Sequence, residues 1–447
     1  GNRWGFFPSA SVGWRISEEP FFLPARRLVD NLKIRASFGS LGNQNVSSYY
    51  TFARLVSIAN LNYTFGEGSV LPKYSTLGAP IASDMTWETA QQWDFGFDLT
   101  MLGNRLNLTV DGYIRDTRDM LTDGVELPSV YGASMPEMNA ADLRTKGYEI
   151  TLNWHDQLTL GGKPFEYSIG VNLSDYKSIV TKYDNQDKTF ARDFYEGMEI
   201  GEIWGFVTDG LFQTDEEAQA YADQVDLTYV LKGQTGGWQA GDVKFVDLNG
   251  DNKVNIGSNN VNAPGDRKIL GNSLPSLSYG ITASVRWNGI DVSAFFQGTG
   301  NHYWYPDGES MPFWGAYSYP YLSFLQKDFL QDVWSTDNTD AYFPRAMAYS
   351  ASSGVLSNIN DRYLQNIRYL RFKNLTVGYT LPQQWTQKAG IESVRVYFTG
   401  ENLCYWSPLK KHSKYVDPEG AIDRSGAYNN AFYPWQKSFL FGIDVTF

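Results

Sequence analysis

The chain lacks the features that identify several common protein classes. Its 447 residues include a single cysteine, Cys404, which excludes an internal disulfide framework, and three histidines that lie far apart. No apolar run approaches the roughly 18 residues that a membrane-spanning helix needs. Charged residues make up 19%, the formal net charge is −12 and no basic stripe is visible, so a nucleic-acid partner is not expected.

Catalytic motifs are missing as well. The sequence contains no G-x-S-x-G, H-E-x-x-H, P-loop or dinucleotide-binding fingerprint, and its many carboxylates have no recognisable partner motif. The chain is instead rich in aromatic residues (16%) and glycine (42 residues), a composition that suits many strands joined by polar loops and argues against disorder. We therefore expect an all-β protein that is not an enzyme and requires no cofactor.

Alternation of apolar and polar residues with a period of two is the strongest signal. In the last such segment, Phe439, Phe441 and Ile443 are separated by single residues that include Gly442 and Asp444. Because successive side chains of a strand point to opposite faces, each segment has one apolar face and one polar face. The pattern predicts about eleven strands of the kind that cross a bilayer at a tilt. They are residues 10–16, 32–38, 93–99, 105–115, 148–154, 165–173, 276–287, 290–296, 375–381, 394–398 and 439–447.

Short and long connections take turns between these segments. Asn288-Gly289 is a strong hairpin signal, whereas long connections fill residues 178–275 and 299–364. Outer-membrane barrels have short turns on the periplasmic side and long loops on the outside. The sequence therefore predicts a transmembrane antiparallel β-barrel in which 178–275 and 299–364 are extracellular loops. A soluble all-β protein with a few long loops would show the same alternation and stays open at this point.

Several stretches, in order from end to end, resemble one known family. They are GNRWGFFPSAS (1–11), WRISEE (14–19), LKIRASFG (32–39), TKGYE (145–149), YLRFKNLTVGYTLP (369–382) and VRVYFTGENL (394–403), and the terminal aromatic Phe447 also fits. The chain thereby resembles the SusC/RagA family of TonB-dependent outer-membrane transporters from Bacteroidetes-type bacteria.

The resemblance implies a barrel of about 22 strands around an N-terminal plug, as wide barrels of this kind have. It also implies energy delivered by the TonB complex, a SusD-like lipoprotein over the outside loops, and import of a bulky glycan or peptide across the bacterial outer membrane. With about eleven strands and no plug, residues 1–447 are expected to be the C-terminal half of such a barrel. They would be a partial sequence or one piece of a split transporter, completed by the remaining barrel half and the plug.

Two alternatives come from other classes of protein. The first is a secreted soluble all-β module that binds carbohydrate or acts as an adhesin, which should leave the membrane pellet without detergent. The second is a glycoside hydrolase, which would require two opposed carboxylates about 5–9 Å apart in a cleft.

One stretch of the first long loop has the spacing of a calcium-binding loop. Oxygen side chains recur at alternate positions, the backbone carbonyl of Lys253 would serve at the seventh position, and an acidic residue followed by arginine comes later. Asn252 stands where glycine is usual, and the twelfth position has no glutamate. Ca²⁺ in the 247–266 loop is therefore weighed against an Asx-rich turn without an ion. The candidate ligands are Asp247, Asn249, Asp251, Lys253, Asn255 and Asp266.

The second long loop holds an aromatic cluster whose flat faces suit sugar rings or peptide side chains. The alternative, which we favour, is that the rings pack the loop onto the barrel rim or onto a partner lipoprotein. An amphipathic helix is predicted over Phe324–Trp334, and arginines such as Arg105, Arg286 and Arg395 are expected to point into the lumen. The candidate substrate-binding residues are Tyr303, Trp304, Tyr305, Trp314, Tyr317 and Tyr319.

Overall fold

The structure is a computed structural model of the chain. It describes residues 4–43, 54–63, 71–81, 85–123, 130, 137–232, 234, 236–321, 325, 327–421 and 435–447. Among these residues, no helix combines the length and the apolar character that a bilayer crossing requires.

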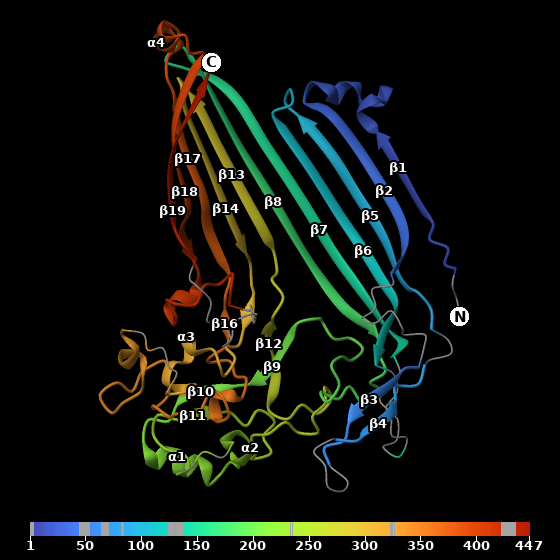
Figure 1. Cartoon of the computed structure of the whole chain (residues 1–447), viewed down its shortest axis with the longest axis vertical. Coiled ribbons are helices and arrows are strands. Elements are labelled where there is room, and N and C mark those ends of the chain that lie inside the picture. Colours follow the sequence, from blue (N-terminus) through green and yellow to red (C-terminus); the bar gives the residue numbers. More distant parts are fainter. Residues whose placement is uncertain are drawn as a thin grey trace.

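A single antiparallel sheet of eleven strands dominates the fold (Figure 1). Each strand pairs with the next strand of the sheet along the chain, so the sheet is a meander with β1 and β19 at its edges. All eleven strands predicted from the alternation are present, so that prediction is confirmed. They are β1 (Ser9–Arg15), β2 (Val29–Asn43), β5 (Glu88–Met101), β6 (Leu106–Asp123), β7 (Glu137–Leu160), β8 (Lys163–Lys182), β13 (Ser278–Trp287), β14 (Ile290–Thr299), β17 (Tyr369–Thr380), β18 (Ser393–Trp406) and β19 (Ser438–Thr446).

Several strands are much longer than the alternation predicts. β7 has 24 residues and β8 has 20, whereas a tilted bilayer crossing takes about 9–11. Beyond the apolar stretch the backbone pairing continues between polar residues, as where Asp116 and Arg144 pair across β6 and β7 with an ion pair of 2.6 Å. The two long connections therefore begin later than predicted, at residues 183 and 300, and they end slightly past the predicted ends, at residues 277 and 368.

The strand register sorts side chains onto two faces with opposite character. Ile281 of β13 pairs with Val171 of β8 and Phe296 of β14, which places three apolar residues in one row of one face. On the other face, Ser284 pairs with Ser168 and Ser293. The side chains of Phe439 and Phe441 are exposed, Phe441 by 83%. In the described part of the chain every other sheet has only two strands, so no second sheet covers the apolar face.

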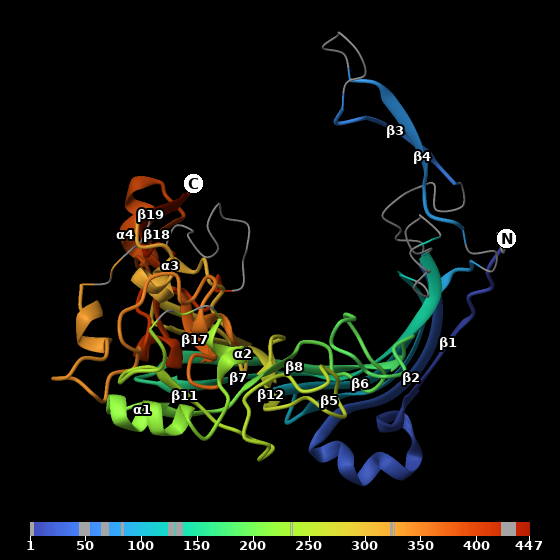
Figure 2. The ribbon, with the colours of Figure 1, turned by 90° about the horizontal axis from the view of Figure 1, so that it is seen from below.

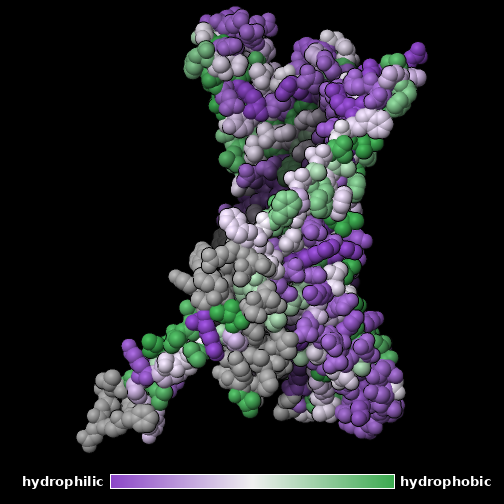
Figure 3. Space-filling view, turned by 90° about the vertical axis from the view of Figure 1, so that its right-hand side faces the viewer, coloured by the Kyte–Doolittle hydropathy of each residue, from purple (hydrophilic) through white to green (hydrophobic). Residues whose placement is uncertain are grey.

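The sheet is curved. Seen from its loop end, it bends into a trough whose two rims are β1 and β19 (Figure 2). Figure 3 looks onto the convex side near β1, where apolar residues gather across the middle of the strands and hydrophilic residues gather toward both ends. An apolar belt between two polar zones on the outside of a curved sheet is the surface that a membrane barrel presents to lipid.

Short connections lie at one end of the strands and long ones at the other (Figure 1). Asn288 and Gly289 join β13 to β14 with positive φ angles of 50° and 83°, as a two-residue hairpin turn requires. The other short links include η1 (Ile16–Glu18), η2 (Pro20–Arg27), α4 (Gln383–Thr386) and η7 (Gln387–Ala389), and the hairpin of β3 (Val56–Asn60) and β4 (Lys73–Leu77) lies at the loop end.

Three long connections fold together into one compact unit, which we call the loop module: residues 183–277, 300–368 and 407–421. They share a single hydrophobic core, to which the first contributes Phe212 and Phe245, the second Trp314 and Phe343, and the third Leu409. The elements of this module are β9 (Glu202–Phe206), β10 (Thr208–Leu211), α1 (Asp215–Ala222), α2 (Thr228–Leu231), β11 (Val243–Phe245), β12 (Arg267–Asn272), β15 (Tyr303–Trp304), α3 (Met311–Trp314), η4 (Gly315–Tyr317), η5 (Phe329–Asp332), η6 (Val355–Ser357), β16 (Gln365–Asn366) and η8 (Pro408–Lys411).

The amphipathic helix predicted over Phe324–Trp334 is wrong for the residues that can be described. Within 327–334 there is only the short 3-10 helix η5, after which Val333 adopts extended backbone and pairs with Phe343. Phe329 and Val333 are both buried in the core of the loop module. Packing against the other loops, which no local pattern records, therefore decides the conformation here; Phe324 and residue 326 lie outside the described residues.

Candidate functional site

The polar face of the sheet carries ion pairs that cross three strands at a time. Arg35 of β2 reaches across β5 to Asp111 of β6, with Nη1 2.6 Å from a carboxylate oxygen, and its Nε lies 3.3 Å from Asp98. The residue between Arg35 and Asp111 in the register is Gly96. A β-carbon at Gly96 would overlap the Asp111 carboxylate, so the glycine makes the pairing possible.

The same construction recurs on the other side of the sheet. Arg395 of β18 reaches across β17 to Asp291 of β14 at 2.7 Å and also contacts Asp444 of β19 at 3.2 Å. Gly378 of β17 lies between the paired side chains, and a β-carbon there would overlap both. We call this polar face the inner wall. Its neighbouring charges of both signs compensate one another while remaining partly exposed to water.

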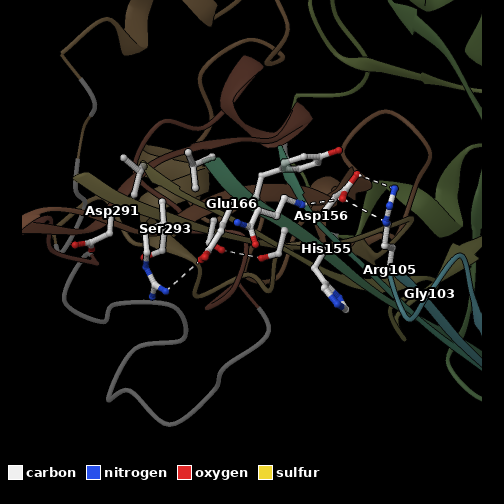
Figure 4. A pocket seen from close by; sticks show the side chains of 14 residues that line it. Gly103, Arg105, His155, Asp156, Glu166, Asp291 and Ser293 are labelled. Atoms are coloured by element: carbon white, nitrogen blue, oxygen red, sulfur yellow. Dashed lines mark hydrogen bonds and ion pairs between the residues drawn. The ribbon is translucent and has the colours of Figure 1, made fainter. Parts of the chain in front are cut away.

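The inner wall is hollowed at the short-turn end, where an open cavity of about 710 Å³ is lined by the turn between β5 and β6 and by residues of β7, β8, β13 and β14. Arg105 and Asp156 form an ion pair at one end of this cavity, while Asp291 and Ser293 lie at the other (Figure 4). Between them Glu166 receives a contact of 3.4 Å from Arg286. The structure thus places Arg286 and Arg395 on the polar face, as the sequence predicts. Arg105 lies in the turn before β6, and its partner Asp156 is in register with Tyr167 of the apolar face.

At the loop end, a second group of charges joins the inner wall to the loop module. Nη2 of Arg371 in β17 lies 2.6 Å from both carboxylate oxygens of Asp417, and its Nε lies 3.4 Å from Glu419. Lys373 contacts Glu419 at 2.9 Å. The Arg371 side chain is only 2% exposed and also lies 4.8 Å from the ring of Tyr405. We call Arg371, Lys373, Asp417 and Glu419 the Arg371 cluster.

Polar contacts inside the loop module fix its three segments to one another. Asp242 of the first segment is buried and accepts a 2.7 Å hydrogen bond from Arg345 of the second. Burial raises the pKa of Asp242, and the guanidinium of Arg345 opposes that shift. His412 of the third segment stacks on Tyr342 at 3.6 Å; burial, Lys411 and Arg362 lower the pKa of His412 to about 4, so the ring is neutral at pH 7.

The predicted aromatic site divides into buried and accessible residues. Trp304, Trp314 and Tyr317 are buried in the core of the loop module, and the Tyr317 hydroxyl donates to the Pro344 carbonyl at 2.5 Å. Their ring faces contact other side chains of the module. Tyr303, Tyr305 and Tyr319 are partly accessible, and the hydroxyl of Tyr305 donates to the Leu356 carbonyl.

The accessible part of the cluster includes residues that the sequence pattern did not identify. The Tyr319 ring lies 6.0 Å from that of Tyr321 and 6.1 Å from that of Tyr349, and the last two side chains are exposed. Tyr349 is distant in sequence and has a positive φ of 61°, so no local motif connects it with Tyr319. Substrate binding by Tyr303, Tyr305 and Tyr319 stays a prediction.

In the loop predicted to bind calcium, the side chains accept hydrogen bonds from the backbone of the loop itself. The Asp247 carboxylate accepts hydrogen bonds from the backbone N–H groups of Gly250 and Asn252, at 2.7 and 2.8 Å. Asp266 is fully buried below the loop, and accepts from the N–H groups of Leu248 and Asn255 at 2.8 Å. Burial raises the pKa of Asp266 although these hydrogen bonds oppose the shift.

The remaining candidate ligands are engaged in the same turn. The side chain of Asn249 accepts from the N–H of Asp251, that of Asp251 from the N–H of Lys253, and that of Asn255 from the N–H of Gly257. Within the described residues, no three histidine, cysteine or acidic side chains are grouped so that they could hold a metal ion. Calcium binding therefore remains a prediction from sequence spacing.

Calcium titration tests that prediction. If the 247–266 loop binds the ion, calorimetry on chelator-stripped protein gives a saturable heat, and an ion concentration of about 100 times Kd stabilises the fold by about 2.7 kcal/mol. Asp247→Asn combined with Asp251→Asn removes both effects, whereas Asp187→Asn combined with Asp193→Asn, in another acidic stretch of the same loop, leaves them in place. Absence of heat and of any shift in Tm would reject the ion.

Architecture and surface together define the class of protein. A curved antiparallel meander with an apolar convex side and a charged inner wall is a β-barrel wall of the outer-membrane type. Residues 1–287 match the family described as TonB dependent receptor-like, beta-barrel, and the chain belongs to that family. This agrees with the resemblance to SusC/RagA transporters that the sequence stretches indicate.

Relatives with known names are similar along the whole chain. TonB-dependent receptor P3 of Formosa agariphila is 27% identical, covering 100% of this chain and 42% of its own length. TonB-dependent receptor SusC of Bacteroides thetaiotaomicron is also 27% identical, covering 100% of this chain and 40% of its own length. The chain thus spans about two fifths of the length of these relatives, and their names describe receptors rather than enzymes.

Solved structures share the fold. The RagAB peptide importer in its open-open state has a TM-score of 0.69 at 19% identity, covering 99% of this chain and 42% of that chain. A structure of the RagAB peptide transporter has a TM-score of 0.68 at 21% identity, with 99% and 43% covered. At this level of identity, the likeness shows the fold alone.

Proposed function

We propose that the protein imports a bulky nutrient across the bacterial outer membrane in a TonB-dependent manner. One observation carries the proposal: the eleven-stranded sheet turns an exposed apolar face outward and a face of compensated charges inward. Apolar rows such as the half-buried row of Ile281, Val171 and Phe296 suit contact with lipid, while the inner wall suits a hydrated lumen. Family membership supports the same conclusion.

Closure of the barrel requires further strands. β1 and β19 each have one edge without a partner strand in the described residues. Unpaired backbone groups cost several kcal/mol each in hydrocarbon, so both edges have to be covered. In the proposed transporter, the remaining barrel half covers them, the plug fills the lumen against the cavity of the inner wall, and TonB acts through the part that carries the plug.

The partner and the substrate class follow from the loop module. We place the module on the cell exterior, where a SusD-like lipoprotein covers it and delivers a glycan or a peptide. The names of similar proteins support this assignment, since one is SusC and another is the RagAB peptide importer. The partly accessible ring of Tyr319 and the exposed rings of Tyr321 and Tyr349 offer flat surfaces of the kind that bind either ligand.

Labelling of engineered cysteines tests the sidedness. In a Cys404→Ser background, Glu216→Cys on α1 should react with a membrane-impermeant maleimide on intact cells, because α1 belongs to the loop module. Lys388→Cys on η7 at the short-turn end should react only after lysis. Both positions are exposed, so accessibility within the fold is matched. Equal labelling of both on intact cells, or recovery of the protein in the soluble fraction without detergent, would contradict the proposal and favour a secreted all-β module.

Uptake measurements test the partner and the cargo. Fluorescent oligopeptides and oligosaccharides are offered to cells that carry the transporter, and the accumulated class is expected to depend on TonB and on the neighbouring lipoprotein. Loss of uptake on deletion of either one supports the assignment. Uptake that persists without both would remove the TonB-dependent mechanism, while accumulation of neither class would remove the proposed substrates.

A further inference from the structure

The connection between β1 and β2, at the short-turn end of the sheet, contains η1 and η2. It carries large apolar side chains that the rest of the chain leaves exposed: Phe21 by 65% and Leu23 by 57%. With about three residues per turn of a 3-10 helix, these two side chains lie on either side of Phe22, which is half-buried. The connection therefore turns Phe22 toward the protein and presents Phe21 and Leu23 outward.

Phe21 contacts the apolar face of the sheet. Its ring lies 6.2 Å from that of Trp14 in an edge-on arrangement. Trp14 is in register with Ile34, and this row continues through apolar residues to Leu173 of β8. Leu173 is two residues from Val171, so the row belongs to the apolar face of the sheet. The connection thus continues that face beyond the end of β1.

The connection lies outside the barrel wall. In Figure 1 it caps the short-turn end of β1 and β2, and in Figure 2 the same dark-blue segment projects from the convex side of the trough. A further strand paired with β1 would lie beside it within the wall, because strands pair in the plane of the sheet. The plug of the proposed barrel lies on the concave side. The connection therefore borders on what surrounds the barrel.

Its height is that of a membrane interface. Trp14 is the next-to-last residue of β1, and Trp287 is the last residue of β13 at the same end of the sheet. Trp287 is six residues from Ile281, so it also lies on the apolar face. Tryptophans at the ends of such strands form the aromatic girdle at the border of the hydrocarbon. Irregular backbone is not found exposed to lipid at greater depth, so the 3-10 segments belong at this border.

Polar contacts hold the connection in place. The indole N–H of Trp14 donates to the Glu19 carboxylate at 2.9 Å. The guanidinium of Arg26 donates to the Ser17 carbonyl at 2.6 Å and to the Glu18 carboxylate at 3.1 Å. These bonds tie both ends of the connection to each other and to β1. The exposed apolar side chains are therefore presented in a fixed position.

We infer that residues 16–28 anchor the barrel wall in the inner leaflet of the outer membrane, with Phe21 and Leu23 inserted at the boundary of headgroups and acyl chains. Interfacial segments bind membranes through Trp, Phe and Leu side chains together with basic residues. Arg27 supplies the basic group: it is exposed, has no ion pair within the described residues, and its guanidinium suits a lipid phosphate.

Continuity with the apolar face favours lipid over a protein partner. Phe21 packs on Trp14, and Trp14 ends a row of the face that lipid covers in the proposed barrel. The same medium therefore reaches the connection without a break. The inference rests on the proposed function, because it requires the convex side to face lipid.

Quenching by spin-labelled lipids tests the inference on the transporter purified from outer membranes and reconstituted in vesicles of phosphatidylcholine and phosphatidylglycerol. Single cysteines in the Cys404→Ser background carry a bimane label, and the vesicles contain phosphatidylcholine with a nitroxide on the headgroup or deep in an acyl chain. Because interfacial segments lie roughly 5–10 Å into the headgroup boundary, the headgroup nitroxide should quench Phe21→Cys about twofold more strongly than the deep one. Leu23→Cys, which keeps the contact of Phe21 with Trp14, should behave in the same way, and Ile281→Cys should show the reverse order.

Ser284→Cys is the matched control. It is exposed near the same end of the sheet but pairs with Ser168 and Ser293 on the inner wall, so neither lipid should quench its label. If the labels of the connection are not quenched while Ile281→Cys is, if the deep nitroxide quenches them more strongly, or if Ser284→Cys is quenched equally, the inference is overturned and the transport proposal stands. If Ile281→Cys is not quenched either, the convex side does not touch lipid and the proposed function itself fails.

Discussion

Replacing Ile281 with lysine is expected to destabilise the protein in the membrane by about 2–4 kcal/mol, the range for a lysine on the lipid face near the middle of an outer-membrane barrel. Ile281 lies in β13 between Val171 and Phe296, in a row that is apolar across three strands. A lysine there has no charge of opposite sign within its row. Its ammonium therefore has to reach the interface past other side chains or stay in hydrocarbon.

The adjacent residue supplies the control. Thr282 points to the inner wall, where it pairs with Gly170, so Thr282→Lys places the same charge on the hydrated face. We expect its stability in lipid vesicles, measured by urea-induced unfolding, to stay close to that of the unmodified protein. If both variants are destabilised to the same extent, or if neither is destabilised, the two faces of the sheet do not contact different solvents and the barrel assignment fails.

The strands could be predicted from sequence because the alternation of apolar and polar residues that specifies them is a local pattern. One apolar face in contact with lipid demands alternation residue by residue, as in Phe439, Phe441 and Ile443, and a shift of one residue would turn every side chain to the wrong face. The strand ends could not be predicted equally well. Past the apolar belt both faces meet water, so the alternation stops although backbone pairing continues, as at Asp116 and Arg144.

The loop module shows the opposite situation. Its core brings together residues from three connections, such as Phe212, Trp314 and Leu409, and no local periodicity records contacts at that separation. The aromatic cluster was therefore visible as a composition, but the division into buried Trp314 and Tyr317 and accessible Tyr319 was not. The glycine-spanned ion pairs of the inner wall were hidden for the same reason, since their partners lie on strands far apart in sequence.

The loop module also supplies the acidic partners of the positive charges at the loop end of the sheet. In the sequence, Arg371 stands in a stretch that resembles the SusC/RagA family, and no local pattern connects it with Asp417, the residue 46 positions away that it contacts in the fold. A buried cation between two carboxylates ties the third segment of the module to the barrel wall. If that segment moves away from the wall, this contact has to break. The strength of the contact therefore determines how firmly the segment is held.

Arg371→Ala is therefore expected to weaken the docking of residues 408–421 by about 3–5 kcal/mol, because removing one partner of a buried ion pair leaves the other charges uncompensated. Asp417 and Glu419 would face each other with only Lys373 to compensate them, and each of the two carboxylate side chains is 12% exposed. Hydrogen exchange of 408–421 should accelerate by roughly two to four powers of ten, since exchange reports the free energy of local opening.

Two variants separate this effect from simple loss of charge. Arg286→Ala removes an arginine whose pair with Glu166 is largely exposed, and should change exchange very little. Arg371→Lys keeps the charge but cannot contact Asp417 and Glu419 at the same time, so an intermediate acceleration is expected. Unchanged exchange in Arg371→Ala would show that the hydrophobic contacts of Leu409 and Val416 alone hold the segment, and that the cluster is not what fixes it to the wall.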